Sequence, residues 1–330
     1  MKIIYSLIGV LALILIVALG VGTADLQYLF GVIIPVLAAL VFGVGIIYRV
    51  IKWARSPVPF HIPTTCGQQK SLPWIKSATL ENPQGRWGVI ARMALEIFLF
   101  RSLFRNTRVE LRDGPRLAYG TTKYLWLGGL LFHWSFLIIL LRHFRFFVEP
   151  VPFFVLFIQR IDGFFQVGVP ILYVTDIFIL LALSYLFFRR IVSPKIRYIS
   201  LIADYFALLL ISAIVISGIL MRYFWKVDLI AAKELVLSIF SFHPVVPEGI
   251  GLLFYIHLFL VSCLLVYFPM SKLMHMGGVF LSPTRNLSNG SRARRHVNPW
   301  NPPVKVHTYE EWEDEFHDLI KGAGLPLDKE

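Results

Sequence analysis

Four histidines lie in or beside long apolar segments, and their spacing is the feature of this sequence most suggestive of chemistry. His133 and His143 are ten residues apart in one segment, and His257 and His275 are eighteen apart in another. An ionisable side chain inside a membrane is costly and usually has a partner or a function. Two pairs on two separate segments predict the axial ligands of two bis-histidine haems stacked across a bilayer.

The composition predicts that these segments cross a membrane. Of 330 residues, 57% are hydrophobic and 16% are charged, whereas about a quarter of a soluble domain is charged. A helix needs about 20 apolar residues to span the hydrocarbon core. We expect an all-α polytopic membrane bundle with six transmembrane helices, and the six stretches are Ile3–Gly22, Leu29–Val50, Tyr124–Phe147, Val167–Phe188, Ile199–Tyr223 and Gly249–Pro269.

The basic residues between these stretches predict the orientation, because Lys and Arg mark cytoplasmic loops. The segment from Arg49 to Lys123 holds thirteen basic residues and four acidic ones, and the link from Arg189 to Arg197 holds only basic ones. The alternate loops are nearly balanced. Both termini are therefore expected in the cytoplasm, in a multi-pass protein of the cytoplasmic membrane. Topology accounts for most of the net charge of +12, so we do not expect nucleic acid as a partner.

The first stretch resembles a secretory signal, but its apolar run is longer than usual and favours a retained helix.

Four regions follow from this organisation. Residues 1–52 hold two transmembrane helices, and residues 53–122 form a basic cytoplasmic loop. Within that loop, Arg86 to Arg108 mixes arginines with apolar residues, which is typical of a helix lying in the membrane interface; a docking platform for a cytoplasmic partner is a compatible use. Residues 123–275 form a four-helix unit carrying the histidines. Residues 276–330 form a polar tail with an acidic patch at Glu310–Glu315, expected either to order against a partner or to stay solvated.

Cysteine usage restricts the kind of cofactor. The chain has only Cys66 and Cys263, with no CxxC pair. It therefore has no iron–sulfur site of its own, and no CxxCH motif for covalent haem attachment. Any haem is expected to be non-covalent, of b type.

Depth in the membrane predicts how the histidines pair. The third and sixth stretches run in opposite directions, so His143 and His257 meet near the outer face, and His133 and His275 near the inner face. At a rise of about 1.5 Å per residue, the separations are about 15 Å and about 27 Å. A bend at Pro269 and helix tilt are expected to absorb the difference. Glycines beside the ligands, Gly128–Gly129 and Gly277–Gly278, are expected to allow a haem to approach the backbone.

Other polar residues complete the predicted site. Arg142 and Arg145 are candidates to pair with the propionates of the outer haem. Asp176 and Asp204 lie within spans, where they serve either proton transfer or the capping of polar neighbours. Two alternatives stay open: histidines that are merely structural, and a non-redox scaffold or transporter whose histidines line a polar cavity.

The ten and eighteen spacing resembles that of the haem b subunit of respiratory nitrate reductases, NarI, over roughly Leu29 to His275. The extra N-terminal span and the long basic loop are more similar to DsrM, the haem b membrane subunit of the sulfite-reduction-associated DsrMKJOP complex. DsrM is itself related to the membrane subunit of heterodisulfide reductase, and a gamma-type haem b subunit of a nitrate or heterodisulfide reductase is the alternative interpretation.

The resemblance implies roles for residues and partners. It implies that His143 and His257 hold the distal haem and that His133 and His275 hold the proximal one. It also implies electron transfer between menaquinone at the outer face and a cytoplasmic iron–sulfur subunit of the DsrK type, within a complex holding other DsrJOP-like subunits. In NarI a lysine in the outer loop helps to hold the quinone. The loop after His143 has no lysine, which leaves Arg160 and Asp162 as the expected quinone residues.

Overall fold

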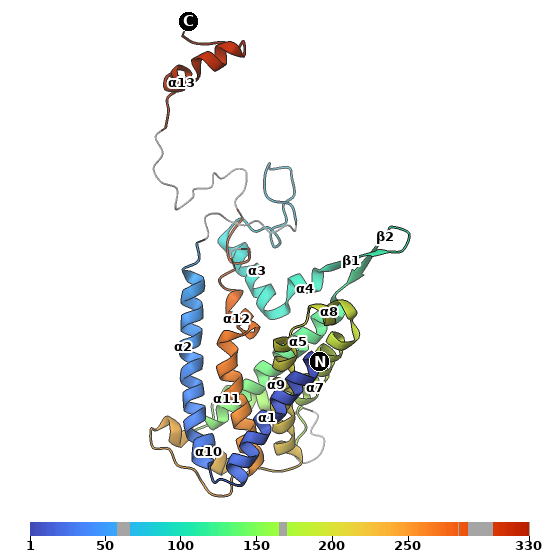
Figure 1. The fold of residues 1–330 in the computed structure, drawn as a ribbon, viewed down its shortest axis with the longest axis vertical. Coiled ribbons are helices and arrows are strands. Elements are labelled where there is room, and N and C mark those ends of the chain that lie inside the picture. The colour runs from blue at the N-terminus through green and yellow to red at the C-terminus, as the bar shows by residue number, and fades with distance from the viewer. Residues whose placement is uncertain (58–66, 165–169, 283, 290–305, 330) are drawn as a thin grey trace.

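The computed structural model describes residues 1–57, 67–164, 170–282, 284–289 and 306–329. Its body is a bundle of long helices running roughly side by side (Figure 1). The long helices are α1 (Lys2–Gly22), α2 (Ile34–Ala54, preceded by a π-helical turn, Leu29–Ile33), α5 (Lys123–His143), α7 (Val174–Val192), α9 (Ile202–Tyr223) and α11 (Leu252–Met270).

Five of these helices are long and apolar enough to cross a membrane, and together they establish a multi-pass membrane protein. The predicted count of six is met only if α7 is included. That helix begins at Val174 rather than Val167, and its 19 residues include Asp176, Arg189 and Arg190. It nevertheless packs along α5 and α9 inside the bundle. Its charges lie in its first and last turns, where they can reach the two surfaces of a bilayer.

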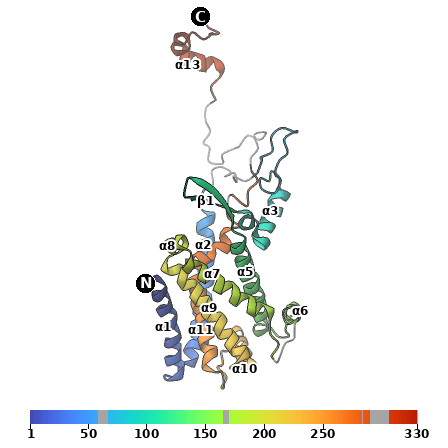
Figure 2. The same cartoon turned by 90° about the vertical axis from the view of Figure 1, so that its right-hand side faces the viewer.

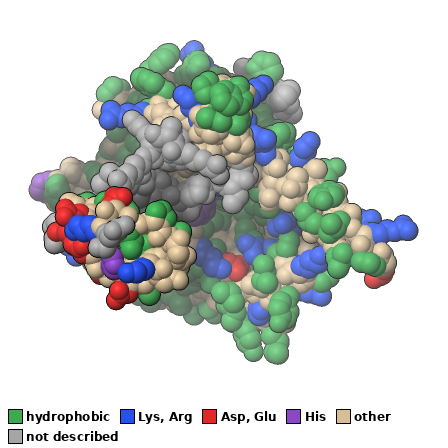
Figure 3. Space-filling view, turned by 90° about the horizontal axis from the view of Figure 1, so that it is seen from above, with side chains coloured by type: hydrophobic (Ala, Val, Ile, Leu, Met, Phe, Trp, Pro, Cys, Tyr) green, Lys and Arg blue, Asp and Glu red, His purple; other side chains and the backbone are tan. Residues whose placement is uncertain are grey.

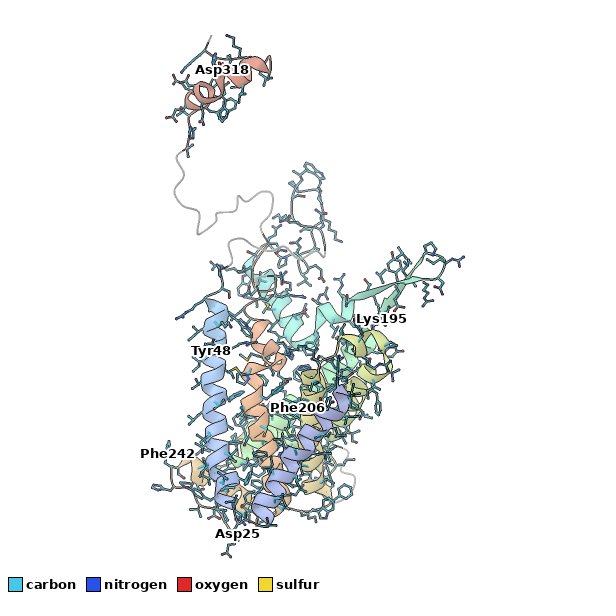
Figure 4. The ribbon with its side chains drawn as sticks, in the orientation of Figure 1. Asp25, Tyr48, Lys195, Phe206, Phe242 and Asp318 are labelled. Carbon is cyan, nitrogen blue, oxygen red and sulfur yellow. The ribbon has the colours of Figure 1, made fainter. Side chains whose placement is uncertain are left out.

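The shorter elements divide between the two ends of the bundle. The helices α6 (Phe153–Asp162) and α10 (Leu229–Phe240) lie at the end that carries Asp25 and Phe242 (Figures 1, 2 and 4). The opposite end carries α3 (Arg86–Leu99), α4 (Arg101–Arg105) and α8 (Pro194–Ile199). The Lys2 ammonium donates to the carbonyl of Ser200 at 2.8 Å, which ties the start of α1 to the segment after α8. The first of these ends is the one that the charge distribution predicts to face outward, and the second is the one predicted to face the cytoplasm.

Apolar side chains both fill the bundle and cover it. Val10, Leu210 and Leu260 from three different helices form one buried cluster, and Val17, Phe30 and Tyr255 are part of a second. On the outside of α1, leucines such as Leu11 and Leu15 are exposed. An exposed apolar stripe of this kind is suited to lipid, because acyl chains are as apolar as leucine.

Glycines allow two pairs of helices to approach closely. A Cβ at Gly45 of α2 would lie 2.7 Å from Pro269 of α11, and one at Gly128 of α5 would lie 2.5 Å from the Tyr185 ring of α7. At either position an added Cβ would force its neighbour, Pro269 or the Tyr185 ring, to shift. Gly128 therefore serves helix packing, and our expectation that it admits a haem is wrong for this residue.

The cytoplasmic end departs from the sequence prediction in one respect. The expected helix over Arg86–Arg108 is broken at Phe100, whose φ of +49° ends α3, and the chain turns into an antiparallel hairpin of β1 (Thr107–Arg112) and β2 (Arg116–Thr121). Val109 pairs with Tyr119 and Leu111 with Leu117, so one face of the hairpin is apolar. The hairpin projects from the bundle (Figure 1), and a view from above shows basic and apolar groups at this end (Figure 3).

Two further segments build up the cytoplasmic side. Arg92 of α3 is buried and donates to the carbonyls of Arg285 and Leu287, so α3 is fastened to the chain that follows α12 (His275–Gly278). Burial lowers the pKa of the Arg92 guanidinium. The acidic tail forms α13 (Tyr309–Gly322), which begins with a capping box of Thr308 and Glu311.

Candidate haem-binding site

The structure brings the four histidines together in the two predicted pairs. The ring centres of His143 and His257 are 6.4 Å apart with nearly parallel planes, at 11°. Those of His133 and His275 are 5.8 Å apart with nearly perpendicular planes, at 88°. The two pairs come from α5 on one side and from α11 and its continuation on the other, as the depth argument predicts.

These separations fit one metal ion between two imidazoles. An imidazole nitrogen binds a metal at about 2 Å and lies ~1.1 Å from its ring centre, so two axial rings have centres roughly 6.3 Å apart. The outer pair lies at this spacing and the inner pair is half an ångström closer. The side chains of His133, His143 and His275 are exposed and His257 is half-buried, so there is open space beside the rings.

The hydrogen bonds of the histidines leave the metal-binding nitrogen free. The Nδ1 atoms of His133 and His143 lie 2.7 Å from the carbonyls of Gly129 and Ile139, and Nδ1 of His275 lies 2.9 Å from that of Lys272. A carbonyl only accepts, so each Nδ1 carries the proton and each Nε2 has a lone pair. Histidines that bind metals usually donate their other N–H in this way.

Ser217 sets the same tautomer at the fourth histidine. Its hydroxyl lies 2.9 Å from Nδ1 of His257 and also donates to the carbonyl of Ile214 at 2.9 Å. We assign the hydroxyl proton to the carbonyl of Ile214, so that the Ser217 oxygen accepts from His257. The neighbouring Gly218 packs against the same ring, with a Cβ position 3.4 Å from it. Sequence reasoning missed both residues because they lie on α9, forty positions from His257.

The two ligands on the last span are not on one continuous helix. The expected bend at Pro269 is present: α11 ends at Met270, directly after that proline. Ser271 is extended, and a 3₁₀ turn (Lys272–Met274) leads into His275. A proline removes a backbone hydrogen bond and breaks the helix. This break lets His275 meet His133, although the two histidines of α5 are ten residues apart and the two of the last segment are eighteen apart.

Asp204 holds the segment that carries His275. Its carboxylate accepts from the Leu201 amide at 2.9 Å, which caps α9, and forms an ion pair with Lys272 at 3.0 Å. Lys272 is also the residue whose carbonyl accepts from His275. Of the two roles that the sequence leaves open for Asp204, the contacts favour the capping of polar neighbours.

An aromatic ring from the cytoplasmic side reaches the inner pair. Phe100, at the break between α3 and α4, lies edge-on to His133 with ring centres 5.0 Å apart. Trp134 donates to the carbonyl of Phe98 at 3.0 Å and so holds α3 against α5. The other glycines beside the ligands are Gly129, Gly277 and Gly278. Gly129 faces open space, whereas Gly277 and Gly278 face Trp53 of α2 and not the space where a haem was expected.

The predicted outer residues separate into two groups. Arg142 forms ion pairs with Asp176 at 2.9 Å and with Asp162 at 3.2 Å, and all three are largely buried. Asp162 therefore lies in a buried cluster rather than on the outer surface. The Nε of Arg142 is a buried donor without a partner among the described residues, and an anionic group or a water commonly fills such a position. The structure does not bring Arg145 or Arg160 into this cluster.

A pocket on the outer face was not foreseen. It has a volume of about 480 Å³, is widely open, and lies between Glu149 and one side of α10. Lys233 of α10 forms an ion pair with Glu149, and Glu234 and Ser238 also line the pocket. Phe147, four residues after His143, packs on Phe240 of α10. The loop after His143 has no lysine, but helix α10 brings Lys233 to Glu149 of that loop.

Comparisons with known proteins agree with this architecture. The family model of the nitrate reductase gamma subunit matches residues 86–290. An Hdr-like menaquinol oxidoreductase cytochrome b-like subunit from Archaeoglobus fulgidus is 50% identical over 281 residues, which cover 83% of this chain and 84% of that protein. A protein of the same description from Archaeoglobus profundus is 42% identical over 276 residues, or 82% of each chain.

Proposed function

This chain belongs to the nitrate reductase gamma subunit family and has the electron-transfer role of a membrane cytochrome b, and from that premise we propose that it holds two haems b between menaquinone and a cytoplasmic partner. His143 and His257 are the ligands of the outer haem, and His133 and His275 those of the inner haem. The observation that carries the proposal is the geometry of the two pairs. Both have ring spacings suited to a shared metal ion, and all four histidines present a free Nε2.

The protein's part in the chemistry follows from these contacts. A haem with two axial imidazoles has no open position for oxygen, so it supplies one-electron transfer only. The carbonyls of Gly129, Ile139 and Lys272 fix three rings in the binding tautomer, and Ser217 fixes the fourth. Arg142, whose Nε has no described partner, remains our candidate for a propionate of the outer haem, with Arg145 beside it.

We place the menaquinone site at the outer face. A quinol releases two protons with its two electrons, so it needs an acceptor of protons near the outer pair. Glu149 and Glu234 supply carboxylates in the pocket beside α10, and Lys233 supplies a donor for a quinone oxygen. The residues proposed from the sequence lie at α6: Arg160 remains a candidate contact, while Asp162 acts from within the buried cluster.

We assign the electron exit to the cytoplasmic face. His275 lies there, beside α3 and α4, and Phe100 joins these helices to His133. The chain's two cysteines are too few for an iron–sulfur cluster, so a partner must supply the redox centre that follows. A DsrK-type iron–sulfur subunit, with other DsrJOP-like subunits, is the partner that the resemblance to DsrM suggests. A sulfite-linked complex is accordingly our first choice over a nitrate or heterodisulfide reductase.

Haem content and histidine variants test the ligand assignment. The purified chain should bind about two haems that are extractable in acid acetone, with b-type bands in the reduced-minus-oxidised spectrum. His143→Ala should lose the same spectral component as His257→Ala, and His133→Ala the same one as His275→Ala, because each iron loses one axial bond. Loss of one shared component from both His143→Ala and His133→Ala would contradict the pairing. An absence of haem bands would favour a scaffold or transporter.

A quinone analogue tests the side of the membrane. It should perturb the spectrum of the haem lost in His143→Ala and leave the other nearly unchanged. Lys233→Ala should weaken this response, whereas Lys226→Ala, in the connection that precedes α10 and outside the pocket lining, should leave it intact. A response confined to the haem of His133 and His275 would place the quinone at the inner face instead.

A further inference from the structure

Four elements meet in a buried polar cluster at the outer end of the bundle, directly beside the outer histidine pair. It joins α5, the last residue of α6, the first turn of α7 and the last turn of α9, whose positions can be followed in Figure 2. Asp162 closes α6 and accepts from the amide and hydroxyl of Thr175, at 2.9 and 2.7 Å. The cluster thereby fixes α6 to α7.

Arg142 is the centre of the cluster. Its guanidinium bridges Asp162 and Asp176, and Asp176 also accepts from the hydroxyl of Tyr223 at 2.8 Å. Arg142 directly precedes His143 in the last turn of α5. The same bonds that hold the guanidinium therefore fix the height and rotation of the turn that carries the outer ligand.

Tyr173 closes the cluster. Its ring lies between the guanidinium groups of Arg142, at 3.8 Å, and Arg222, at 4.0 Å. Its backbone amide donates to the hydroxyl of Tyr223 at 3.1 Å. Both arginines thus have a fixed orientation, and two positive charges are balanced by two carboxylates.

A purely stabilising role explains this arrangement poorly. Removing charges from water is costly, and apolar residues of similar volume often stabilise a protein as well as a buried ion pair does. The charges of Arg142 and Asp176 act on the His143 ring in opposite senses: the guanidinium disfavours positive charge there, and the Asp176 carboxylate favours it. At such short range in a medium of low dielectric constant, one unit of charge has a large effect on a redox centre.

We propose that Asp162 and Asp176, with Arg142 and Tyr223, are positioning residues for the outer histidine pair, and that the two carboxylates lower the reduction potential of the haem held there. The proposal rests on the assignment of that haem to His143 and His257. Negative charge stabilises the oxidised, more positive iron, so each carboxylate opposes reduction. A lower potential of the outer haem favours passage of electrons toward the inner one.

Redox titration of the two haems in the full chain tests this proposal. Asp176→Asn removes one negative charge at almost constant volume, so the potential of the haem assigned through His143→Ala should rise while the other stays unchanged. Asp176→Glu retains the charge and should restore a potential near the original. Asp204→Asn is the matched control, because that carboxylate pairs with Lys272 beside His275 and should affect the inner haem alone.

Each outcome of the redox titrations either supports or overturns the proposal. Asp162→Asn is a second variant in case Asp176→Asn binds no haem, and the same rise is expected from it. Unchanged potentials, or equal shifts of both haems, would overturn the proposal. Loss of both haems from both variants would also overturn it, since the cluster would then support the fold as a whole. A chain without haem before any substitution would instead refute the proposed function.

Discussion

The hydrogen bond between Ser217 and His257 shows how a single residue can determine whether a histidine is ready to bind metal. The other three histidines donate to backbone carbonyls, which no side-chain substitution removes. The His257 ring differs from them in bonding to a side chain, in addition to a backbone hydrogen bond at Ile214. Outer contacts of this kind orient a ligand, and their loss commonly weakens metal binding by about 10- to 100-fold.

Ser217→Ala should therefore weaken haem binding at the outer site by about 10- to 100-fold and leave the inner site loaded. Haem titration of the purified chain, followed at the two spectral components, measures this effect. Ser262→Ala is a matched control: Ser262 is also buried, but its hydroxyl bonds only to the carbonyl of Leu258 in its own helix. Equal weakening by both variants would contradict the role given to Ser217.

The sequence predicts a site residue only where the spacing of residues within one segment indicates its role. His133 and His143 share a helix, and depth in a membrane then selects their partners. Ser217 and Phe100 were not predictable, because α9 and α3 are brought to the histidines by packing alone. Asp162 was expected at the surface because it ends a loop-like stretch, yet Arg142 and Thr175 bury it.

At the scale of elements, hydropathy predicts that long helices exist, but it locates their ends unevenly. The end of α11 lies at Met270, beside the Pro269 at which it was expected, whereas α7 begins later than the apolar run suggests. The hairpin was missed because the alternation of Arg108, Val109, Glu110 and Leu111 follows directly on a helical pattern. In contrast, the capping box of Thr308 and Glu311 is a signal for α13 that the sequence does contain.

The close approach of α2 to Pro269 leads to a prediction about the packing of α2 against α11. Gly45→Ala places a methyl group 2.7 Å from the proline ring, which must push α2 and α11 apart. Overpacking of this kind costs about 1–3 kcal/mol, so the thermal unfolding temperature in detergent should fall, and the inner haem should be lost first. Gly43→Ala, two residues away and facing open space, should leave both unchanged. Identical behaviour of the two variants would exclude this contact as a determinant of stability.

At the scale of the whole molecule, the charged ends of α7 decide the topology. If α7 spans the membrane, Lys195 lies in the cytoplasm and Asp25 and Phe242 lie outside (Figure 4). Glu110 of the cytoplasmic hairpin pairs with Lys195 at 3.3 Å, which agrees with that side. Hydrogen bonds from Arg108 and Lys195 lower the pKa of Glu110, so the carboxylate stays charged at neutral pH.

Single cysteines introduced into a chain without Cys66 and Cys263 test this topology. A membrane-impermeant thiol reagent applied to intact cells should label Asp25→Cys and Phe242→Cys, and should label Lys195→Cys only after the cells are opened. Labelling of Lys195→Cys in intact cells would show that α7 does not cross the membrane and that five spans are correct.

The break after Pro269 has a consequence for biogenesis. Both outer ligands lie on regular helices that can assemble within the bilayer as soon as α11 has been inserted. The inner site is complete only when the segment from Ser271 to His275 has folded back onto α9 and α3 has settled over His133. Loading would then be ordered, the outer haem first. Cells starved of haem should accumulate a half-loaded chain with only the outer haem, a species that can be reduced by quinol but has no route for delivering the electron.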